Sequence, residues 1–395
     1  MRAALICLPP PGDGVSLRIA GRSAAQSQLA LALQCGCELV IAHGHGASSE
    51  AIELRHRAEA AGARFQTVNN AHALIGAVGQ GGSLLVLQAG LWAEAGEVLE
   101  ALRSPACVMV LPAGIGVQAG FEQIDLDRAW AGALVLPGQL LAALSSLPED
   151  IAPAPALLRV ALQSRLPEIR LAAEHLDDGS WCLLRSPAAA DQHERRWLRR
   201  VVGEGRGTGV SARFARLALN LRGAKLAGHP RGLAAVIAIL AGILVGAIAA
   251  AWQGYAAFGF VLLAFAATLT EFSIGLARIR AAPFGRVRHW PRLRYLLDAA
   301  LGVCAVCAID GLWQRALFAP LVLIAGLQLL DRREWPAIAE ALRDRGVIAA
   351  VLAVTVLALS GEPAIMLVAG IILSANLVPV GRGSTGRAQI QRNRS

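Results

Sequence analysis

Hydrophobic positions divide the chain into two halves with different periodicities. In the first half, short apolar runs alternate with stretches of helical period. The runs that we predict as strands are residues 3–8, 38–43, 64–68, 83–87, 107–111 and 130–136. The predicted helices between and after them are residues 24–34, 48–61, 71–78, 91–103 and 138–147. This alternation predicts an α/β domain with a mostly parallel sheet that is covered on both faces.

The second half carries much longer apolar runs. They begin at Gly232 and form six segments, residues 232–252, 255–277, 295–312, 316–330, 347–360 and 364–380. A helix needs about 20 apolar residues to cross the hydrocarbon core of a bilayer. We therefore expect an all-α membrane domain of six transmembrane helices.

A basic segment separates the two halves. A charged helix is expected at residues 191–200, followed by a glycine-rich break and a helix at 210–226. That second helix carries Phe214, Leu217 and Leu221 on one face and basic residues elsewhere, which is typical of a helix lying on an anionic leaflet. The expected organisation is an α/β domain at 1–185, a basic linker with an interfacial helix at 186–230, and a membrane domain with a basic tail at 231–395.

Charge and composition support a membrane protein. Hydrophobic residues make up 55% of the chain, and the net charge is +9. The arginines flank the apolar runs and recur on one side of them, so membrane lipids are expected partners and nucleic acid is not. With no signal peptide expected at the N-terminus, this distribution predicts a multi-pass protein of the inner (cytoplasmic) membrane with both termini cytoplasmic.

Residues 267–298 form the corner that we single out for function. An apolar helix carries Glu271, leaves the membrane at Ala277-Arg278, passes through an arginine-rich loop and is followed by an apolar helix with Asp298. Acids at the edge of a membrane are expensive to bury and mark candidate functional sites. Glu271 and Arg278 share one helix face, so a simple ion pair between them is the alternative to metal or phosphate binding.

The first 44 residues resemble the opening of a sugar-phosphate nucleotidyltransferase of the GT-A type. The resemblance lies in a strand, a glycine-bearing turn, a helix and a second strand. Its nucleotide loop is reduced to a remnant with Gly12, Gly14 and Arg18, and residues 87–90 (LQAG) lack the metal-binding aspartate of that family. The resemblance therefore implies a GT-A-like fold that has lost catalysis.

The layout of the whole chain resembles the bifunctional proteins that join inositol-phosphate cytidylyltransferase to a CDP-alcohol phosphotransferase. The phosphotransferase family carries D-x-x-D-G-x-x-A-R at the end of its second span, and this chain has TEFSIGLAR at residues 270–278. Ala277 and Arg278 match the pattern. Thr270 and Ser273 stand at the two aspartate positions, and Ile274 replaces the glycine.

The second resemblance implies roles for the corner. Mg²⁺ or Mn²⁺ would be held by Glu271 and Asp298 if the protein is active, with Asp298 as the catalytic base. Phosphate of a CDP-linked alcohol would contact Ala277, Arg278, Arg280 and Arg286. A homodimer or a paralogue is the expected protein partner.

Three functions follow as hypotheses. In the first, the protein is a degenerate CDP-alcohol phosphotransferase-like membrane protein of phospholipid or polar head-group synthesis, which acts by binding or partnering. In the second, it is an active phosphotransferase of altered mechanism that uses Glu271, Arg278 and Asp298. In the third, it is a transporter with a cytoplasmic regulatory domain, against which the sequence shows no internal repeat.

Overall fold

The computed structural model describes residues 1–8, 17–94, 96, 98–148, 151–203, 209–282, 292–309, 313–332 and 341–377. The chain forms two compact units. The first unit contains Met1–Glu204 together with Arg222–His229 and Arg278–Val287. The second unit contains Gly205–Leu221, Pro230–Ala277 and Arg288–Ser395.

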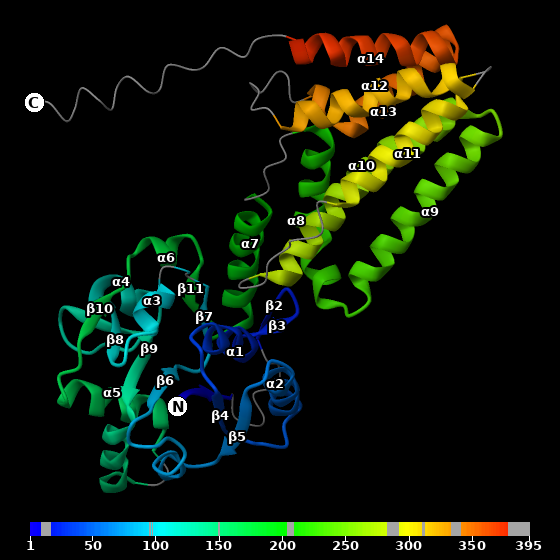
Figure 1. The fold of residues 1–395 in the computed structure, drawn as a ribbon. Coiled ribbons are helices and arrows are strands. Elements are labelled where there is room, and N and C mark those ends of the chain that lie inside the picture. Colours follow the sequence, from blue (N-terminus) through cyan, green and yellow to red (C-terminus); the bar gives the residue numbers. More distant parts are fainter. Residues whose placement is uncertain are drawn as a thin grey trace, which may run out of the picture. The chain divides into compact units, whose positions relative to one another are not determined.

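A seven-stranded sheet forms the centre of the first unit (Figure 1). Its strand order is β10-β8-β9-β6-β1-β4-β5. The strands are β1 (Arg2–Cys7), β4 (Leu39–His43), β5 (Arg64–Val68), β6 (Ser83–Leu87), β8 (Cys107–Pro112), β9 (Arg128–Pro137) and β10 (Glu168–Arg170). Only β9 runs antiparallel to its neighbours, so the mostly parallel α/β sheet is confirmed.

Both faces of the sheet are covered, because alternate side chains of each strand enter different cores. Ala4 and Ile6 of β1 pack under α1 (Ala24–Gln34), α2 (Ser49–Ala60) and α3 (Val98–Leu102). Ala3 and Leu5 pack on the other face with η1 (His72–Leu74), η2 (Gly138–Ser146) and α5 (Pro153–Gln163). This two-sided burial explains why the central strands are almost continuously apolar, whereas the edge strands β5 and β10 carry polar residues. The smaller helices α4 (Ala113–Gln118) and α6 (Glu174–Asp177) complete the α/β part.

The helix expected at residues 91–103 is wrong for its first part. Leu91–Ala93 form β7, which pairs antiparallel with β11 (Trp181–Leu183), and the helix begins only at Val98. Gly90 has φ +78°, which turns the chain sharply before β7. A short apolar run is compatible with either structure, and the distant partner strand decides it. The segment expected as a helix at 138–147 is the 3-10 helix η2.

Two further elements of the first unit matter below. A short hairpin is formed by β2 (Arg18–Ile19) and β3 (Arg22–Ser23). The charged helix that the sequence predicted is α7 (Pro187–Gly203). It buries Trp197, Leu198 and Val201 and leaves most of its arginines toward solvent, which is the amphipathic pattern of a helix packed on a domain surface.

The second unit is helical. The predicted interfacial segment belongs to α8 (Val210–Gly228), and the apolar segments correspond to α9 (Gly232–Trp252), α10 (Ala256–Ala281), α11 (Leu293–Cys307), α12 (Trp313–Asp331), α13 (Arg345–Leu359) and α14 (Gly361–Leu377). These helices from α9 to α14 share one hydrophobic core, in which Phe260, Leu301, Leu323, Leu352 and Ile372 are buried.

The prediction of six transmembrane spans exceeds what the structure shows. In the described part of the chain, α9 and α10 are the two helices long and apolar enough to cross a membrane. Apolar stretches of α12, α13 and α14 are shorter. The 15 residues of α11 or α13 extend about 22 Å at 1.5 Å per residue, against a hydrocarbon core of about 30 Å. The sequence pattern located six apolar helices, but it counted as spans some runs that are too short to cross a bilayer straight.

Gly361 tests the packing at the start of α14. A side chain there would overlap the carbonyl oxygen of Ala308, which follows α11. We expect Gly361→Ala to lower the free energy of unfolding by about 1–3 kcal/mol, because backbone must move to make room. Thermal unfolding of the full chain in detergent measures the change.

Gly370 in the same helix is the matched control. A side chain at Gly370 meets nothing within 4 Å. Gly370→Ala should therefore stabilise the protein by about 0.5–1 kcal/mol through helix propensity. Equal effects of the two substitutions would contradict the packing described.

Candidate functional site

The side chain of Arg345, at the first position of α13, is the centre of a buried charge cluster in the second unit. Its Nε donates to Asp298 at 2.9 Å, and its Nη2 donates to Asp298 at 3.2 Å and to Asp331 at 2.6 Å. Its Nη1 donates to Asp331 at 2.9 Å and to the carbonyl of Arg343 at 3.0 Å. A guanidinium has five N–H donors, and these five hydrogen bonds use them all. We call this arrangement the Arg345 clamp.

The Arg345 clamp ties three helices together. Asp298 comes from α11, Asp331 ends α12 and Arg345 begins α13. The side chains of Asp298 and Arg345 are only 2% and 8% exposed, whereas Asp331 is partly exposed. Removing one partner of a buried ion pair leaves the other charge uncompensated, which is far more costly than losing a surface pair.

Asp344 holds Arg345 in place by capping α13. Its carboxylate accepts the backbone N–H of Gly346 at 2.8 Å, and it also accepts both the backbone N–H and the hydroxyl of Ser211 at 2.6 Å. One buried carboxylate thus satisfies unpaired N–H groups at the starts of α13 and α8. The sequence Asp344-Arg345-Gly346 therefore combines a helix cap with the clamp.

Glu271 forms a separate ion pair. Its two carboxylate oxygens accept from Nε and Nη2 of Arg294 at 2.8 and 2.9 Å. The ion pair between Glu271 and Arg278 that the sequence suggested is wrong, because the partner of Glu271 is Arg294. Seven residues along a helix amount to about 10.5 Å, whereas Arg294 on α11 presents its planar fork directly to the carboxylate.

The hydroxyls at the two aspartate positions of the phosphotransferase pattern are turned back into their own helix. Thr270 donates to the carbonyl of Ala266 at 2.8 Å, and Ser273 donates to that of Leu269 at 2.7 Å. Both side chains are buried. These groups are therefore satisfied within α10.

The remaining residues proposed from the sequence do not join this cluster. Ala277 is buried, and Arg278 and Arg280 lie half-buried in the last turns of α10. Arg18 begins β2, where it donates to the carbonyl of Gly21 at 3.1 Å. The positions of Gly12, Gly14 and Arg286 lie outside the described residues.

The donor set at the corner does not fit a divalent metal ion. Within the described residues, no group of three or more His, Cys, Asp or Glu side chains is placed to hold one. The oxygens of Glu271 and Asp298 accept guanidinium N–H groups of Arg294 and Arg345. Mg²⁺ is usually bound through one or two carboxylates and several waters, and here both carboxylates are already paired with guanidinium groups.

A second buried cluster lies in the first unit and was not found from the sequence. Glu94 follows β7, and its side chain is 5% exposed. It accepts the indole N–H groups of Trp92 at 3.0 Å and Trp197 at 2.6 Å, and it pairs with Arg200. Burial raises the pKa of Glu94, while Arg200 and the two indoles oppose the rise. The cluster fastens α7 to β7, and no local pattern connects residues so far apart in the chain.

His193 completes this second cluster. Its ring meets the edge of Trp92 with centroids 6.3 Å apart, and the side chain is 7% exposed. Among the described residues, none is a hydrogen-bond partner of its Nε2 atom. Burial, together with Arg200 and Arg196, lowers the pKa of His193 to about 4. The imidazole is therefore neutral in the folded protein at neutral pH.

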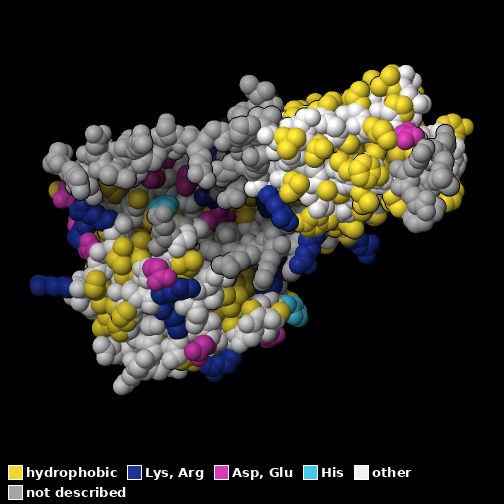
Figure 2. Space-filling model, turned by 45° about the horizontal axis from the view of Figure 1, so that its top comes forward, with side chains coloured by type: hydrophobic (Ala, Val, Ile, Leu, Met, Phe, Trp, Pro, Cys, Tyr) yellow, Lys and Arg dark blue, Asp and Glu magenta, His cyan; other side chains and the backbone are white. Residues whose placement is uncertain are grey.

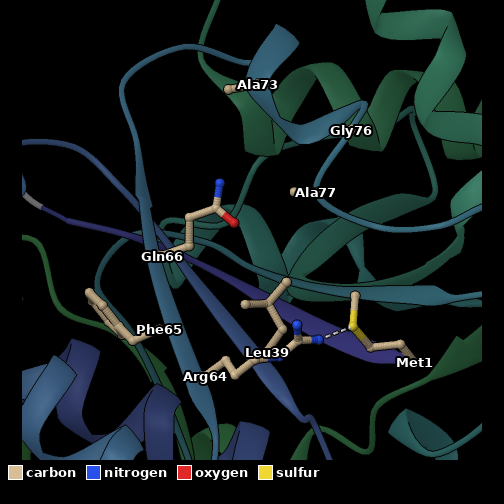
Figure 3. Close-up of a pocket in the computed structure, with 8 residues that line it drawn as sticks. All are labelled: Met1, Leu39, Arg64, Phe65, Gln66, Ala73, Gly76 and Ala77. Carbon is tan, nitrogen blue, oxygen red and sulfur yellow. Dashed lines mark hydrogen bonds between the residues drawn. The ribbon is translucent and has the colours of Figure 1, made fainter.

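A hollow of about 390 Å³ lies at one end of the central sheet of the first unit (Figure 3). It is lined by Met1, Leu39, Arg64, Phe65, Gln66, Ala73, Gly76 and Ala77. Leu39 and Arg64 begin their strands, so the hollow is at the amino end of β4 and β5. Ligands of parallel α/β sheets bind beyond the carboxyl ends. The hollow is therefore not assigned to function.

The comparison with solved structures finds proteins that are similar to the N-terminal region, and we describe one of them. It is a putative glucose-1-phosphate thymidylyltransferase from Bacillus anthracis, solved in complex with a sucrose. The TM-score is 0.35 and the sequence identity 10%, over 44% of this chain and 87% of that one. No family model and no curated protein matches the chain.

The Arg345 clamp predicts a large difference between single and double substitutions. Asp298→Ala leaves a buried guanidinium short of one carboxylate and should cost about 3–5 kcal/mol. The double variant Asp298→Leu with Arg345→Met removes both charges and should recover most of that loss. Thermal unfolding in detergent compares the two, and a harmless Asp298→Ala would contradict the clamp.

The lowered pKa of His193, about 4, predicts acid sensitivity. An unfolded chain binds the proton near pH 6.5, so stability is lost as pH falls from about 6.5 to 4, by at most about 3 kcal/mol. His193→Gln stays neutral and should remove this part of the pH dependence. Denaturant unfolding of the full chain between pH 4 and 7 measures it, with the exposed His56→Gln as a control that should leave the dependence unchanged.

Proposed function

We propose that this chain is an integral membrane protein of polar head-group synthesis that binds, and does not transfer, phosphate-linked head groups. Its helical unit resembles a CDP-alcohol phosphotransferase in which the metal site has been replaced by arginine–carboxylate pairs. The observation that carries the proposal is the Arg345 clamp, because it engages the one fully buried acid of the corner. The protein then acts by binding or as the partner of an active paralogue.

The outer surface of the helices supports a membrane location for all of them. Large apolar side chains are exposed on α10, α11, α12 and α13, such as Phe265, Tyr295, Phe318 and Leu357. Figure 2 shows hydrophobic side chains crowding the surface of this part of the chain. Soluble monomers rarely expose large continuous apolar patches. A bilayer around the six helices, with the arginine-rich ends in the cytoplasm, would satisfy this surface.

The replaced residues argue for binding over catalysis. A phosphotransferase of this type needs carboxylates free to hold metal ions against a diphosphate. Here Thr270 and Ser273 donate to carbonyls of their own helix, and Glu271 is paired with Arg294. The alternative mechanism through Glu271, Arg278 and Asp298 would have to release both acids from their guanidinium partners first.

Arginines at the end of α10 supply the chemistry for binding. Arg278 and Arg280 lie in its last turns. Guanidinium groups bind phosphate oxygens through charge-assisted, often paired hydrogen bonds. We assign the head-group phosphate to this end of α10, outside the Arg345 clamp.

Purified protein in detergent tests both halves of the proposal. With Mg²⁺ or Mn²⁺ and CDP-linked alcohols plus an acceptor lipid or alcohol, we expect no release of CMP above the blank. The CDP-alcohol alone should raise the unfolding temperature, and Arg278→Gln should abolish the rise. Arg332→Gln, an exposed arginine at the end of α12, serves as the matched control and should leave the rise unchanged.

Two outcomes would contradict this proposal. Metal-dependent CMP release that Asp298→Asn abolishes would establish an active enzyme. The binding role of this end of α10 would be contradicted if CDP-alcohol did not stabilise the unaltered protein. It would also be contradicted if CDP-alcohol stabilised the Arg278→Gln variant as well.

A further inference from the structure

The β2–β3 hairpin has a turn whose geometry is strictly set. Ala20 and Gly21 lie at its centre with φ values of +49° and +81°. Positive φ at both central residues is typical of a type I′ turn, which matches the twist of a two-residue hairpin. Ser23, at the end of the hairpin, is the N-cap of α1, where it accepts the N–H of Gln26 at 3.2 Å. The hairpin is therefore fixed to a helix that packs on the central sheet.

This six-residue hairpin contacts three helices within the first unit. The backbone N–H of Ala20 donates to Glu194 of α7 at 2.7 Å. Gly21 lies against Gly228 at the end of α8, so closely that a Cβ at Gly21 would be 2.3 Å from the Gly228 Cα and one at Gly228 would be 3.1 Å from the Gly21 Cα. The guanidinium of Arg22 donates to the carbonyls of Arg280 and Ala282 at the end of α10. The ends of α8 and α10 belong to this unit, together with the sheet.

The contact made by Arg22 satisfies a specific need of α10. The last carbonyls of a helix lack partners within it. They also carry the negative end of the helix dipole, so a cation there is stabilising by about 0.3–1 kcal/mol or more when partly buried. Two of these carbonyls converge on one planar guanidinium, and Arg22 thus works as a C-terminal cap supplied by a distant part of the chain.

We propose that Arg22 is a positioning residue and that the β2–β3 hairpin is a clamp for the ends of α8 and α10. In this arrangement the hairpin, which directly precedes α1, holds the last turn of α10 with Arg278 and Arg280. Loss of Arg22 frees that turn and leaves the sheet intact. This inference does not depend on the proposed function, since it concerns the order of a helix end and involves no nucleotide.

Hydrogen–deuterium exchange of the full chain in detergent tests the role of Arg22. In Arg22→Ala, amides at residues 280–282 should exchange about tenfold faster, as expected for a lost capping interaction of about 1.4 kcal/mol. Arg22→Lys should be intermediate, because a single ammonium replaces the paired donors. Amides of β1 and β6 should keep their protection.

Arg18→Ala is the matched control on the same hairpin. Arg18 donates to the carbonyl of Gly21, inside the hairpin, and contacts Glu53 only at 4.0 Å. Its loss should leave exchange at 280–282 unchanged. Unchanged exchange there in Arg22→Ala, or equal acceleration in β1 and β6, would overturn the proposal.

A second variant tests the contact with α8 independently. The side chain in Gly228→Leu would press on the backbone of Gly21, with its Cβ 3.1 Å from the Gly21 Cα. Exchange should then rise in the hairpin and at residues 222–228. Gly203→Leu places the same side chain in open space at the end of α7 and should change neither region. Equal effects of the two leucines would contradict a clamp at Gly228.

Discussion

The second unit depends on a positive charge that is shared between two carboxylates in an apolar bundle. A carboxylate taken from water into such surroundings costs several kcal/mol unless its partner is well placed. Asp298 is buried and accepts two hydrogen bonds from Arg345. The other three N–H groups of Arg345 donate to Asp331 and to the carbonyl of Arg343. Asp344 sets the start of α13 and so the place of Arg345. The cap and the ion cluster therefore act as one device that fixes three helices.

The fold of the first unit follows largely from local pattern. Strand β6 and helix α1 have the bounds expected from the sequence, since a buried strand is an unbroken apolar run and α1 starts at a capping serine. The failure at Leu91 has a different cause. Its neighbours are compatible with a helix or a strand, and the choice is made by β11, a partner far along the chain.

The acids of the candidate site could be predicted from the sequence, but their arginine partners could not. Glu271 and Asp298 stand out because acids are rare in apolar helices. Their partners do not stand out, because Arg294 and Arg345 look like the basic residues that flank any membrane helix. Helix spacing identifies neighbours on the same helix, which led to Arg278 for Glu271. The real partners come from adjacent helices, and only tertiary packing selects them.

A guanidinium and a metal ion would give such a corner different chemistry. A metal ion exchanges ligands, binds phosphate oxygens and lowers the pKa of bound water. A guanidinium whose N–H groups are all engaged has no donor left for a substrate, and it cannot act as an acid because it stays protonated. The residues around Arg345 then have a structural role, which is to hold the helices together. Under the proposed function, a phosphate is recognised outside this corner, at the end of α10 that Arg22 holds and that carries Arg278.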